Sequence, residues 1–281
     1  KVWGVYKDIY VKKVNHDPFL NYIVAHSYLK LQFYDSFNRF YKKIGKLDKR
    51  YKRTYPIWVP RKKIKNIMDE LTIFNNFALK KYKEAEENIK KLIKKDPNNN
   101  KINLFLGRLN YNLKNFKKSI SYYENYVSSL EKGFTMPPNE LALFIDQYLG
   151  SIYEMGDMKK FKKLGNAILK DTDKYNVKNP FVERSRMRLS YLIIETIFSE
   201  DTKESYLILE NKIKKFKNKF KDSSYKNRLD YLLGISLINN KKEKEGEEVL
   251  KNILTYKGLP NHLRELVKSE LTLLKINNRT I

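Results

Sequence analysis

Residues 79–97 read LKKYKEAEENIKKLIKKDP, and residues 113–132 read LKNFKKSISYYENYVSSLEK. In both stretches apolar residues recur every three or four positions, which is the period of an amphipathic helix. The two stretches also correspond to each other position by position, at a constant separation of 34 residues. The corresponding pairs are Tyr82 and Phe116, Ala85 and Ser119, Ile89 and Tyr123, and Leu92 and Tyr126. The sequence therefore predicts a repeated helical unit.

A 34-residue period of helix, turn and helix is the signature of the tetratricopeptide repeat, and this chain resembles that family. The family pattern has a Leu-Gly pair in the first helix, an aromatic residue at the turn and a small residue early in the second helix. One unit supplies all of these elements, as Leu106-Gly107, Phe116 and Ser119. The preceding unit supplies the later elements and a closing proline, as Tyr82, Ala85 and Pro97. The resemblance implies an all-α, right-handed α-solenoid, in which each unit buries its apolar face against its neighbours. A helical bundle with a coincidental 34-residue spacing is the alternative.

Two more units are recognisable further along the chain. Residues 148–161 contain Leu149-Gly150 and a Gly-Asp turn, with an interval to the second helix that differs by one residue. Because Phe161 stands at the small position, we expect the two helices of this unit to lie farther apart. Residues 231–254 contain Gly234 and, twelve positions later, Gly246, the interval that also separates Gly107 from Ser119.

The remaining segments fit a divergent repeat array over residues 61–281. Residues 180–221 are predicted to form a helical pair, with Ser199 as the N-cap of its second helix. Residues 261–276 are predicted to form a capping helix at the end of the array. Residues 1–60 are predicted to be an N-terminal helical extension and a basic linker, with one long aromatic helix over 18–44 that begins after Asp17.

The linker contains KRYKRTYPIWVPRKK at residues 49–63, in which two prolines interrupt any continuous helix. Its basic patch consists of Lys49, Arg50, Lys52, Arg53, Arg61, Lys62 and Lys63. We predict that Trp58 packs onto the first repeat or onto the 18–44 helix, because a solenoid end needs its apolar face covered. The competing interpretation is a stacking platform for single-stranded nucleic acid, built from tyrosines between cations.

The chain is strongly basic, with 58 Lys and Arg against 32 Asp and Glu, a net charge of +26. A field of this sign suggests an anionic partner. However, only 11 of the basic residues are arginines, and a vocabulary rich in lysine and asparagine also arises from AT-rich coding without selection for binding. We therefore favour composition as the origin of the total net charge. As evidence for an anionic partner, we attach more weight to the concentration of basic residues in the region 42–65.

Residues typical of catalytic or metal sites are sparse. The sequence has no cysteine, which excludes disulfides, thiolate metal sites and cysteine nucleophiles. Its three histidines are scattered without metal-ligand spacing, and its ten glycines form no phosphate-binding loop. We therefore predict a non-enzymatic protein with no cofactor and no bound metal.

Repeat solenoids bind through the face lined by their first helices, and the resemblance places the candidate residues there. These are Arg108, Tyr111, Gln147, Arg228 and Tyr231. They suit a peptide or helix with apolar anchors and some acid. Packing does not demand the two arginines and the two tyrosines at these positions. The chaperone-tail clamp known in the family is not expected, because Glu70, Phe74 and Phe105 stand at the corresponding positions.

A second candidate set lies in FVERSRMRLSY at residues 181–191, where Arg184 and Arg188 share a helix face and Tyr191 follows one turn later. This set is either a site for an acidic partner or a group of surface ion pairs with nearby glutamates.

The predicted function is a protein–protein interaction scaffold that works within a larger complex. By resemblance, such arrays occur in bacterial cell-envelope machines, such as flagellar motors and outer-membrane or secretion assemblies. A periplasmic or membrane-associated location is therefore favoured over a cytoplasmic one. The alternative is electrostatic binding of nucleic acid or of an anionic membrane through residues 42–65, with nucleic acid the less favoured of the two.

Overall fold

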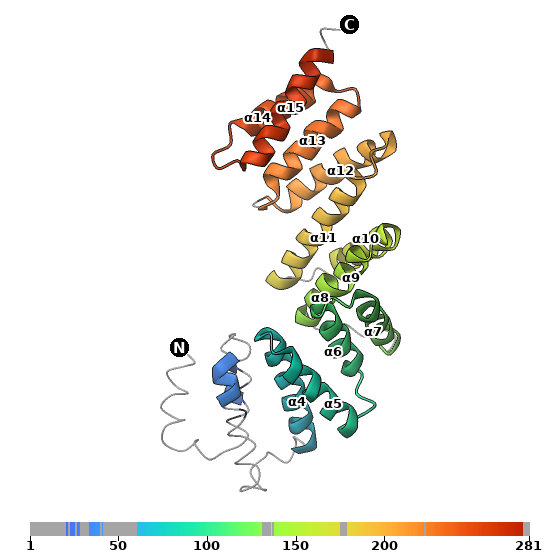
Figure 1. The fold of residues 1–281 in the computed structure, drawn as a ribbon, viewed down its shortest axis with the longest axis vertical. Helices are drawn as coiled ribbons and strands as arrows, with labels where there is room; N and C mark the ends of the chain where they lie inside the picture. The colour runs from blue at the N-terminus through green and yellow to red at the C-terminus, as the bar shows by residue number, and fades with distance from the viewer. Residues whose placement is uncertain are drawn as a thin grey trace. The chain divides into compact units, whose positions relative to one another are not determined.

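The computed structural model describes residues 21, 23–25, 27–28, 34–39, 41, 61–130, 136, 138–174, 179–221 and 223–277. All regular secondary structure in these residues is helical (Figure 1). The chain divides into two compact units, Lys1–Gly133 and Phe134–Ile281. The predicted all-α class is confirmed. The predicted boundary at residue 60 stays a prediction, although helix α4 does begin at Arg61.

The first unit contains two consecutive helical pairs. The helices are α4 (Arg61–Ala78), α5 (Tyr82–Lys95), α6 (Lys101–Asn112) and α7 (Phe116–Ser128). A tight turn joins the helices of each pair, with the left-handed backbone conformation at Lys80 in one and at Lys114 in the other (φ 56° and 60°). These two turns lie 34 residues apart, so the backbone repeats with the period of the sequence.

Small residues bring the two helices of each pair together, as the repeat pattern predicts. The Ser119 hydroxyl on α7 donates to the Gly107 carbonyl on α6 at 3.0 Å, and Ser119 is fully buried. A Cβ atom at Gly107 would lie 3.0 Å from the ring of Tyr123, closer than most such contacts. In the preceding pair Ala85 is fully buried in the apolar core. Close helix–helix contact thus explains the residue types at these positions.

The second unit continues the pattern after α8 (Pro138–Phe144), a π-helical turn η2 (Ile145–Leu149) and α9 (Gly150–Glu154). The helices that follow are α10 (Met158–Lys174), α11 (Pro180–Phe198), α12 (Lys203–Lys219), α13 (Lys226–Asn239), α14 (Glu243–Leu254) and α15 (Asn261–Asn277). The last of these matches the predicted capping helix.

The π-helical turn was not predicted. Phe161 is fully buried and meets Tyr153 edge-on at 5.2 Å, while the spacing of its two helices stays a prediction.

The predicted N-cap at Ser199 is wrong. Helix α12 is capped by Thr202, whose hydroxyl accepts from the Ser205 amide at 3.1 Å. The Ser205 hydroxyl in turn lies 3.0 Å from the Thr202 amide, which completes a capping box. Ser199 instead closes α11, because Asp201 adopts a left-handed conformation (φ 49°) that turns the chain before α12 begins.

The predicted N-terminal extension falls largely outside the described residues. Where it is described, residues 34–39 are helical, and the Asn75 amide on α4 donates to Asn38 at 2.9 Å. Trp58 and the basic residues from Lys49 to Arg53 lie outside the described residues, so the predicted cap stays a prediction. Arg61, Lys62 and Lys63 form the first turn of α4.

Candidate functional site

The first helices of the second unit hold one connected polar cluster. The Arg228 guanidinium on α13 donates to both carboxylate oxygens of Glu195 on α11, with Nε–Oε1 2.9 Å and Nη2–Oε2 3.1 Å. The Tyr191 hydroxyl donates to the same carboxylate at 2.5 Å. Two neighbouring first helices are therefore joined through one carboxylate with three donors.

Aromatic rings flank the two side chains that donate to this carboxylate and extend the cluster to the capping helix α15. Tyr191 stacks on Tyr225 with centroids 4.0 Å apart and planes at 9°. The Arg228 guanidinium lies over the Tyr231 ring at 5.3 Å. The Tyr231 hydroxyl contacts Glu270 on α15 at 3.4 Å. We call Tyr191, Glu195, Arg228, Tyr231 and Glu270 the tyrosine–arginine cluster.

The electrostatics of the cluster favour its ionised form. Burial alone would raise the pKa of Glu195, but hydrogen bonds from Arg228 and Tyr191 outweigh burial and hold that pKa below its ordinary value. The same carboxylate raises the pKa of Arg228, against the effect of burial. At neutral pH the arginine charge is thus neutralised in place. What the cluster can offer a partner is the part-exposed surface of Tyr191 and Arg228 rather than a free cation.

This arrangement predicts an acid-sensitive contribution to stability. Because the folded-state pKa of Glu195 is lowered, the carboxylate stabilises the fold above its unfolded-state pKa, and this contribution is lost as the pH falls through the folded value. Glu195→Gln should cost about 1–2 kcal/mol at pH 7, since it leaves a partly buried guanidinium with a weaker partner. Urea titrations at pH 7 and pH 3 measure this directly. If the unmodified protein and Glu195→Gln differed in unfolding free energy as much at pH 3 as at pH 7, the stabilising role assigned to the Glu195 carboxylate would be contradicted.

In the first unit, Arg108 has a different environment. Its guanidinium lies 4.6 Å from the Phe77 ring centroid and 5.6 Å from that of Phe74, both on α4. Its Nε is buried without a hydrogen-bond partner, and burial lowers its pKa to about 10. Tyr111 lies one turn further along α6 and meets Phe116 at 6.0 Å. Contrary to the expectation from sequence, packing does involve Arg108, as a cation held against two rings.

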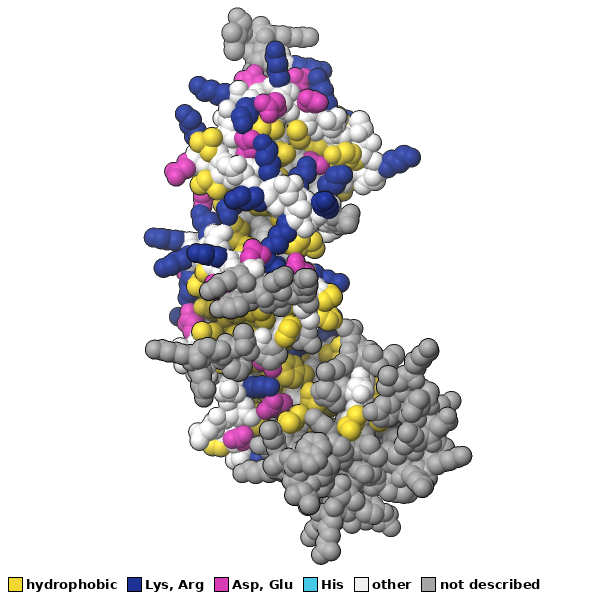
Figure 2. Space-filling view, turned by 180° about the vertical axis from the view of Figure 1, so that it is seen from behind, with side chains coloured by type: hydrophobic (Ala, Val, Ile, Leu, Met, Phe, Trp, Pro, Cys, Tyr) yellow, Lys and Arg dark blue, Asp and Glu magenta, His cyan; other side chains and the backbone are white. Residues whose placement is uncertain are grey.

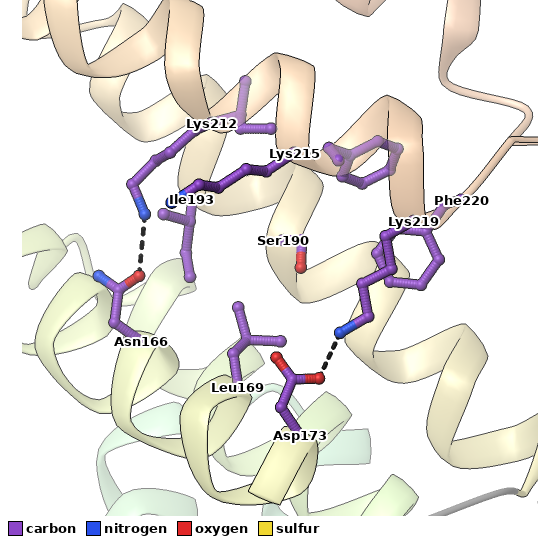
Figure 3. Close-up of a pocket in the computed structure, with 11 residues that line it drawn as sticks. Asn166, Leu169, Asp173, Ser190, Ile193, Lys212, Lys215, Lys219 and Phe220 are labelled. Carbon is purple, nitrogen blue, oxygen red and sulfur yellow. Dashed lines mark hydrogen bonds and ion pairs between the residues drawn. The ribbon is translucent and has the colours of Figure 1, made fainter. Parts of the chain in front are cut away.

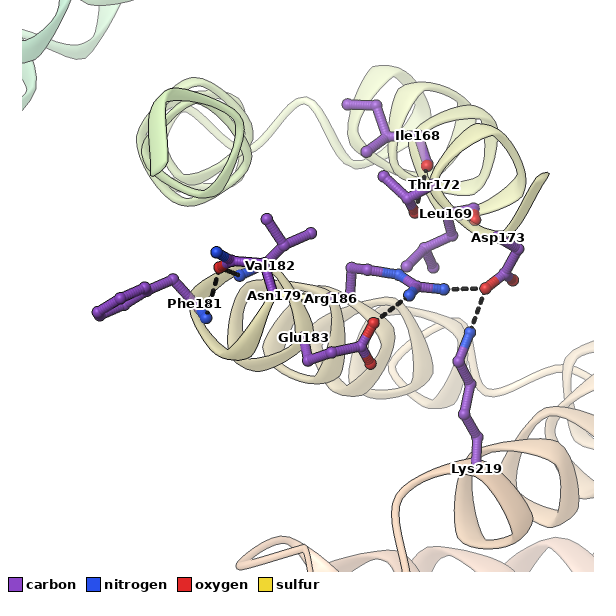
Figure 4. Close-up of polar contacts among 10 residues, drawn as sticks. All are labelled: Ile168, Leu169, Thr172, Asp173, Asn179, Phe181, Val182, Glu183, Arg186 and Lys219. Atoms are coloured by element: carbon purple, nitrogen blue, oxygen red, sulfur yellow. Dashed lines mark hydrogen bonds and ion pairs between the residues drawn. The ribbon is translucent and has the colours of Figure 1, made fainter. Parts of the chain in front are cut away.

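The arginine-rich stretch separates into two faces of α11. Arg184 and Arg188 are exposed. Burial raises the pKa of Asp146, and the hydrogen bond from Ser185 and the Arg188 charge only partly oppose that rise. Arg186 is buried and pairs with both Glu183 and Asp173 (Figure 4). The ion-pair interpretation therefore applies to Arg186, the one arginine of the three that the sequence prediction left out. Residues two apart on a helix point to different sides, which is the signal that separates it from its neighbours.

The other predicted residues lie as follows. Gln147 is within η2 and only 8% exposed, and Tyr231 is 6% exposed, so both contribute little open surface. Glu195 and Glu270 were missed, because no local pattern marks an acid that pairs with a residue on the next first helix.

Within the described residues no group of three or more His, Cys, Asp or Glu side chains could hold a metal ion. No described helix is long and apolar enough to cross a membrane.

Comparison with solved structures supports the repeat assignment. The chain is similar to the C-terminal part of a TPR repeat-containing protein from Cytophaga hutchinsonii, with a TM-score of 0.57, 14% identity, and coverage of 93% of this chain and 92% of that one. It is also similar to PilW, described as a widely conserved type IV pilus biogenesis factor, with a TM-score of 0.54, 14% identity, and coverage of 89% and 98%. No protein-family model matches the chain, and no curated protein matches its sequence. The predicted resemblance is confirmed at the level of the fold, and the chain is a divergent array of tetratricopeptide-like helical pairs.

Proposed function

We propose that this protein is an interaction scaffold that binds a peptide, helix or subunit of another protein along its first helices. The observation that carries the proposal is the tyrosine–arginine cluster, which joins α11, α13 and α15 through side chains of the types that dominate interface energies. Because Tyr191 and Arg228 are hydrogen-bonded to Glu195, their part-exposed side chains are held in place before a partner arrives. Such preorganisation reduces the entropic cost of association.

The first unit contributes to the same proposal through Arg108, Tyr111, Phe74 and Phe77. The Arg108 guanidinium, packed against both rings with its Nε buried, combines a part-exposed cation with the part-exposed ring of Phe74. This combination suits a partner segment that has an apolar anchor and a carboxylate or carbonyl oxygen beside it.

We further propose that the scaffold belongs to a bacterial cell-envelope assembly and acts in the periplasm or at a membrane surface. Support comes from one structural neighbour, PilW, which is described as a type IV pilus biogenesis factor. A flagellar motor or an outer-membrane or secretion machine fits the proposal equally well. We propose binding rather than catalysis as the activity.

Site-specific photo-crosslinking tests the binding face. A benzophenone amino acid is placed at Tyr111, Arg184 or Arg188 on first helices, and at Lys118 or Lys251 on second helices as matched controls. The proposal predicts that one polypeptide is cross-linked from the first-helix positions in cells that make the protein, and is absent from the controls. The same polypeptide appearing only from Lys118 and Lys251 would place the binding face on the second helices.

Alanine at Arg108 together with Tyr111 should weaken capture of that polypeptide by about tenfold, since aromatic and arginine anchors carry most of an interface's energy. Arg108→Met is the matched control, because it keeps an apolar stem against Phe74 and Phe77 and removes only the charge. Unchanged capture by the double variant, with an unchanged melting temperature, would remove this region from the site.

The electrostatic alternative rests on the net charge of +26 and on the basic stretch at 49–63. Binding to nucleic acid or to an anionic membrane through phosphate groups weakens steeply with salt, by about 10³–10⁵ between 50 and 200 mM for six to ten phosphate contacts. A protein partner held by ring contacts should remain bound at moderate salt. Retention measured across this salt range therefore distinguishes the two functions.

A further inference from the structure

A groove lies between α10 and α12, which are the second helices of two neighbouring pairs in the second unit. It encloses a hollow of about 240 Å³ whose floor is formed partly by α11 (Figure 3). The apolar lining comes from all three helices and includes Leu169, Ile193, Ile194 and Phe216. We call this feature the α10–α12 groove.

Two polar bridges cross the groove and bound the hollow between them. At one end Lys212 donates to the Asn166 side-chain oxygen at 3.1 Å. At the other end Lys219 pairs with Asp173 (Figure 3). Lys215 lies between these two lysines on α12 and lines the same hollow. The groove is thus an apolar slot with a row of lysines along one side.

The positive charge of this row is only partly compensated. Lys212 is half-buried, and its bonded partner is a neutral amide rather than a carboxylate. Burial lowers the pKa of Lys212, and the neighbouring charge of Lys215 lowers it further. Lys215 itself pairs with no carboxylate among the described residues. An anion placed beside these two lysines would relieve their mutual repulsion.

The one acid that lines the hollow is already engaged. Asp173 pairs both with Lys219 and with the buried Arg186, which reaches it from α11 (Figure 4). Burial lowers the pKa of Lys219, and the charge of Arg186 acts in the same direction. The groove therefore has an excess of cations that its own acid does not neutralise. On the face shown in Figure 2, basic side chains are widely spread, with apolar side chains visible between them.

We propose that the α10–α12 groove docks an acidic segment of a protein partner, which inserts one large apolar side chain into the hollow and places a carboxylate beside Lys212 and Lys215. Charge complementarity selects the acid, and the apolar walls select the anchor. The hollow is smaller than the roughly 300–1,000 Å³ of sites for drug-sized ligands, so it suits one side chain rather than a long acyl chain. This site opens between two second helices with α11 as part of its floor, and its lining includes none of the side chains proposed for the first-helix face.

Fluorescence anisotropy with the full chain tests the proposal. The probe is a fluorescein-labelled peptide in which one central phenylalanine is flanked on both sides by aspartates and glutamates. We expect saturable binding that weakens about tenfold in the double variant K212Q/K215Q, as expected for the loss of two partly desolvated charge contacts. The matched control is K244Q/K257Q, which removes the same charge from exposed positions of the second unit and should leave the affinity within about twofold.

The apolar half of the proposal has its own test. Ser190→Phe fills the hollow from α11 without changing any charge and should abolish binding. If circular dichroism shows that this variant is unfolded, replacing the phenylalanine of the probe by alanine removes the same contact and should weaken binding to the unmodified protein.

Three results would overturn the proposal. Equal weakening by K212Q/K215Q and K244Q/K257Q would show non-specific attraction to a basic surface. An affinity unaffected both by Ser190→Phe and by the alanine probe would show that the hollow is unused. Failure of the probe to bind would also reject it, and if K212Q/K215Q then reduced sedimentation with phosphatidylglycerol–phosphatidylcholine vesicles, the groove would be a membrane contact instead. None of these results bears on cross-linking from the first helices, so the two proposals fail independently.

Discussion

Ala85→Arg is expected to destabilise the first unit by about 4 kcal/mol or more, the largest effect of any substitution proposed for this protein. Ala85 has no exposed surface and lies in one apolar core with Ile73, Phe77, Ile89 and Phe105. An arginine at this position would either bury an unpaired guanidinium or force α4 and α5 apart. Domains are stable by only about 5–15 kcal/mol, so a loss of this size leaves the unit close to unfolding.

Thermal melting followed by circular dichroism measures this effect. Glu87→Arg is the matched control, because it introduces the same side chain two positions away on the exposed side of α5 and should change stability by only about 0.5 kcal/mol. A melting curve of Ala85→Arg that superimposes on the curve of Glu87→Arg would contradict the helical pairing of α4 and α5.

Gly246→Ala should cost about 2–3 kcal/mol, although alanine is the better helix former. A Cβ atom at this position would lie 2.7 Å from the Gly234 carbonyl oxygen and 2.7 Å from the Ile238 side chain. The carbonyl belongs to the backbone of α13, so it cannot move without shifting the helix. The close approach of α13 and α14 therefore requires glycine at 246.

Gly165→Ala is the matched control for this prediction. A Cβ atom at Gly165 would meet the ends of the Ile193 and Leu189 side chains, at 3.0 and 3.1 Å, and these can rotate away. This variant should stay within about 1 kcal/mol of the unmodified protein, since helix propensity offsets the crowding. Equal melting temperatures for the two alanine variants would show that α13 and α14 can separate without cost.

The repeat pattern predicts small residues at Ser119 and Gly246, and the structure adds the reason for each. The interval of twelve residues from Gly107 to Ser119 recurs from Gly234 to Gly246. The Ser119 hydroxyl donates to the facing Gly107 carbonyl at 3.0 Å, whereas at Gly246 the facing Gly234 carbonyl leaves no room for a side chain. The spacing identified the contact between the helices, while the three-dimensional structure distinguished a hydrogen-bonded contact from a backbone contact.

The candidate binding residues were less accessible to sequence reasoning. Arg228 and Tyr231 were selected as first-helix positions, and Tyr191 was selected with the arginine-rich stretch 181–191. The structure joins Arg228 and Tyr191 through Glu195, and Tyr231 lies beneath the Arg228 guanidinium. The partner acid itself was not selected, since Glu195 and Arg228 lie 33 residues apart, close to one repeat length. A search for opposite charges one repeat apart would have found this pair.

What the sequence by itself determined is the pairing of helices. Helical period, small residues at the crossing points and the 34-residue interval are local or regularly spaced features, and each depends on a few neighbouring residues. What only the tertiary structure decided is the state of each charge. Arg186 is buried and paired, and Arg108 is held against rings. Lys212 shares its groove with Lys215, which pairs with no carboxylate in the described part of the chain. These states depend on side chains from separate helices, such as Lys219 and Asp173, which lie 46 residues apart. Desolvation and pairing act over a few ångströms in space, so they follow from the packed arrangement of helices and not from order along the chain.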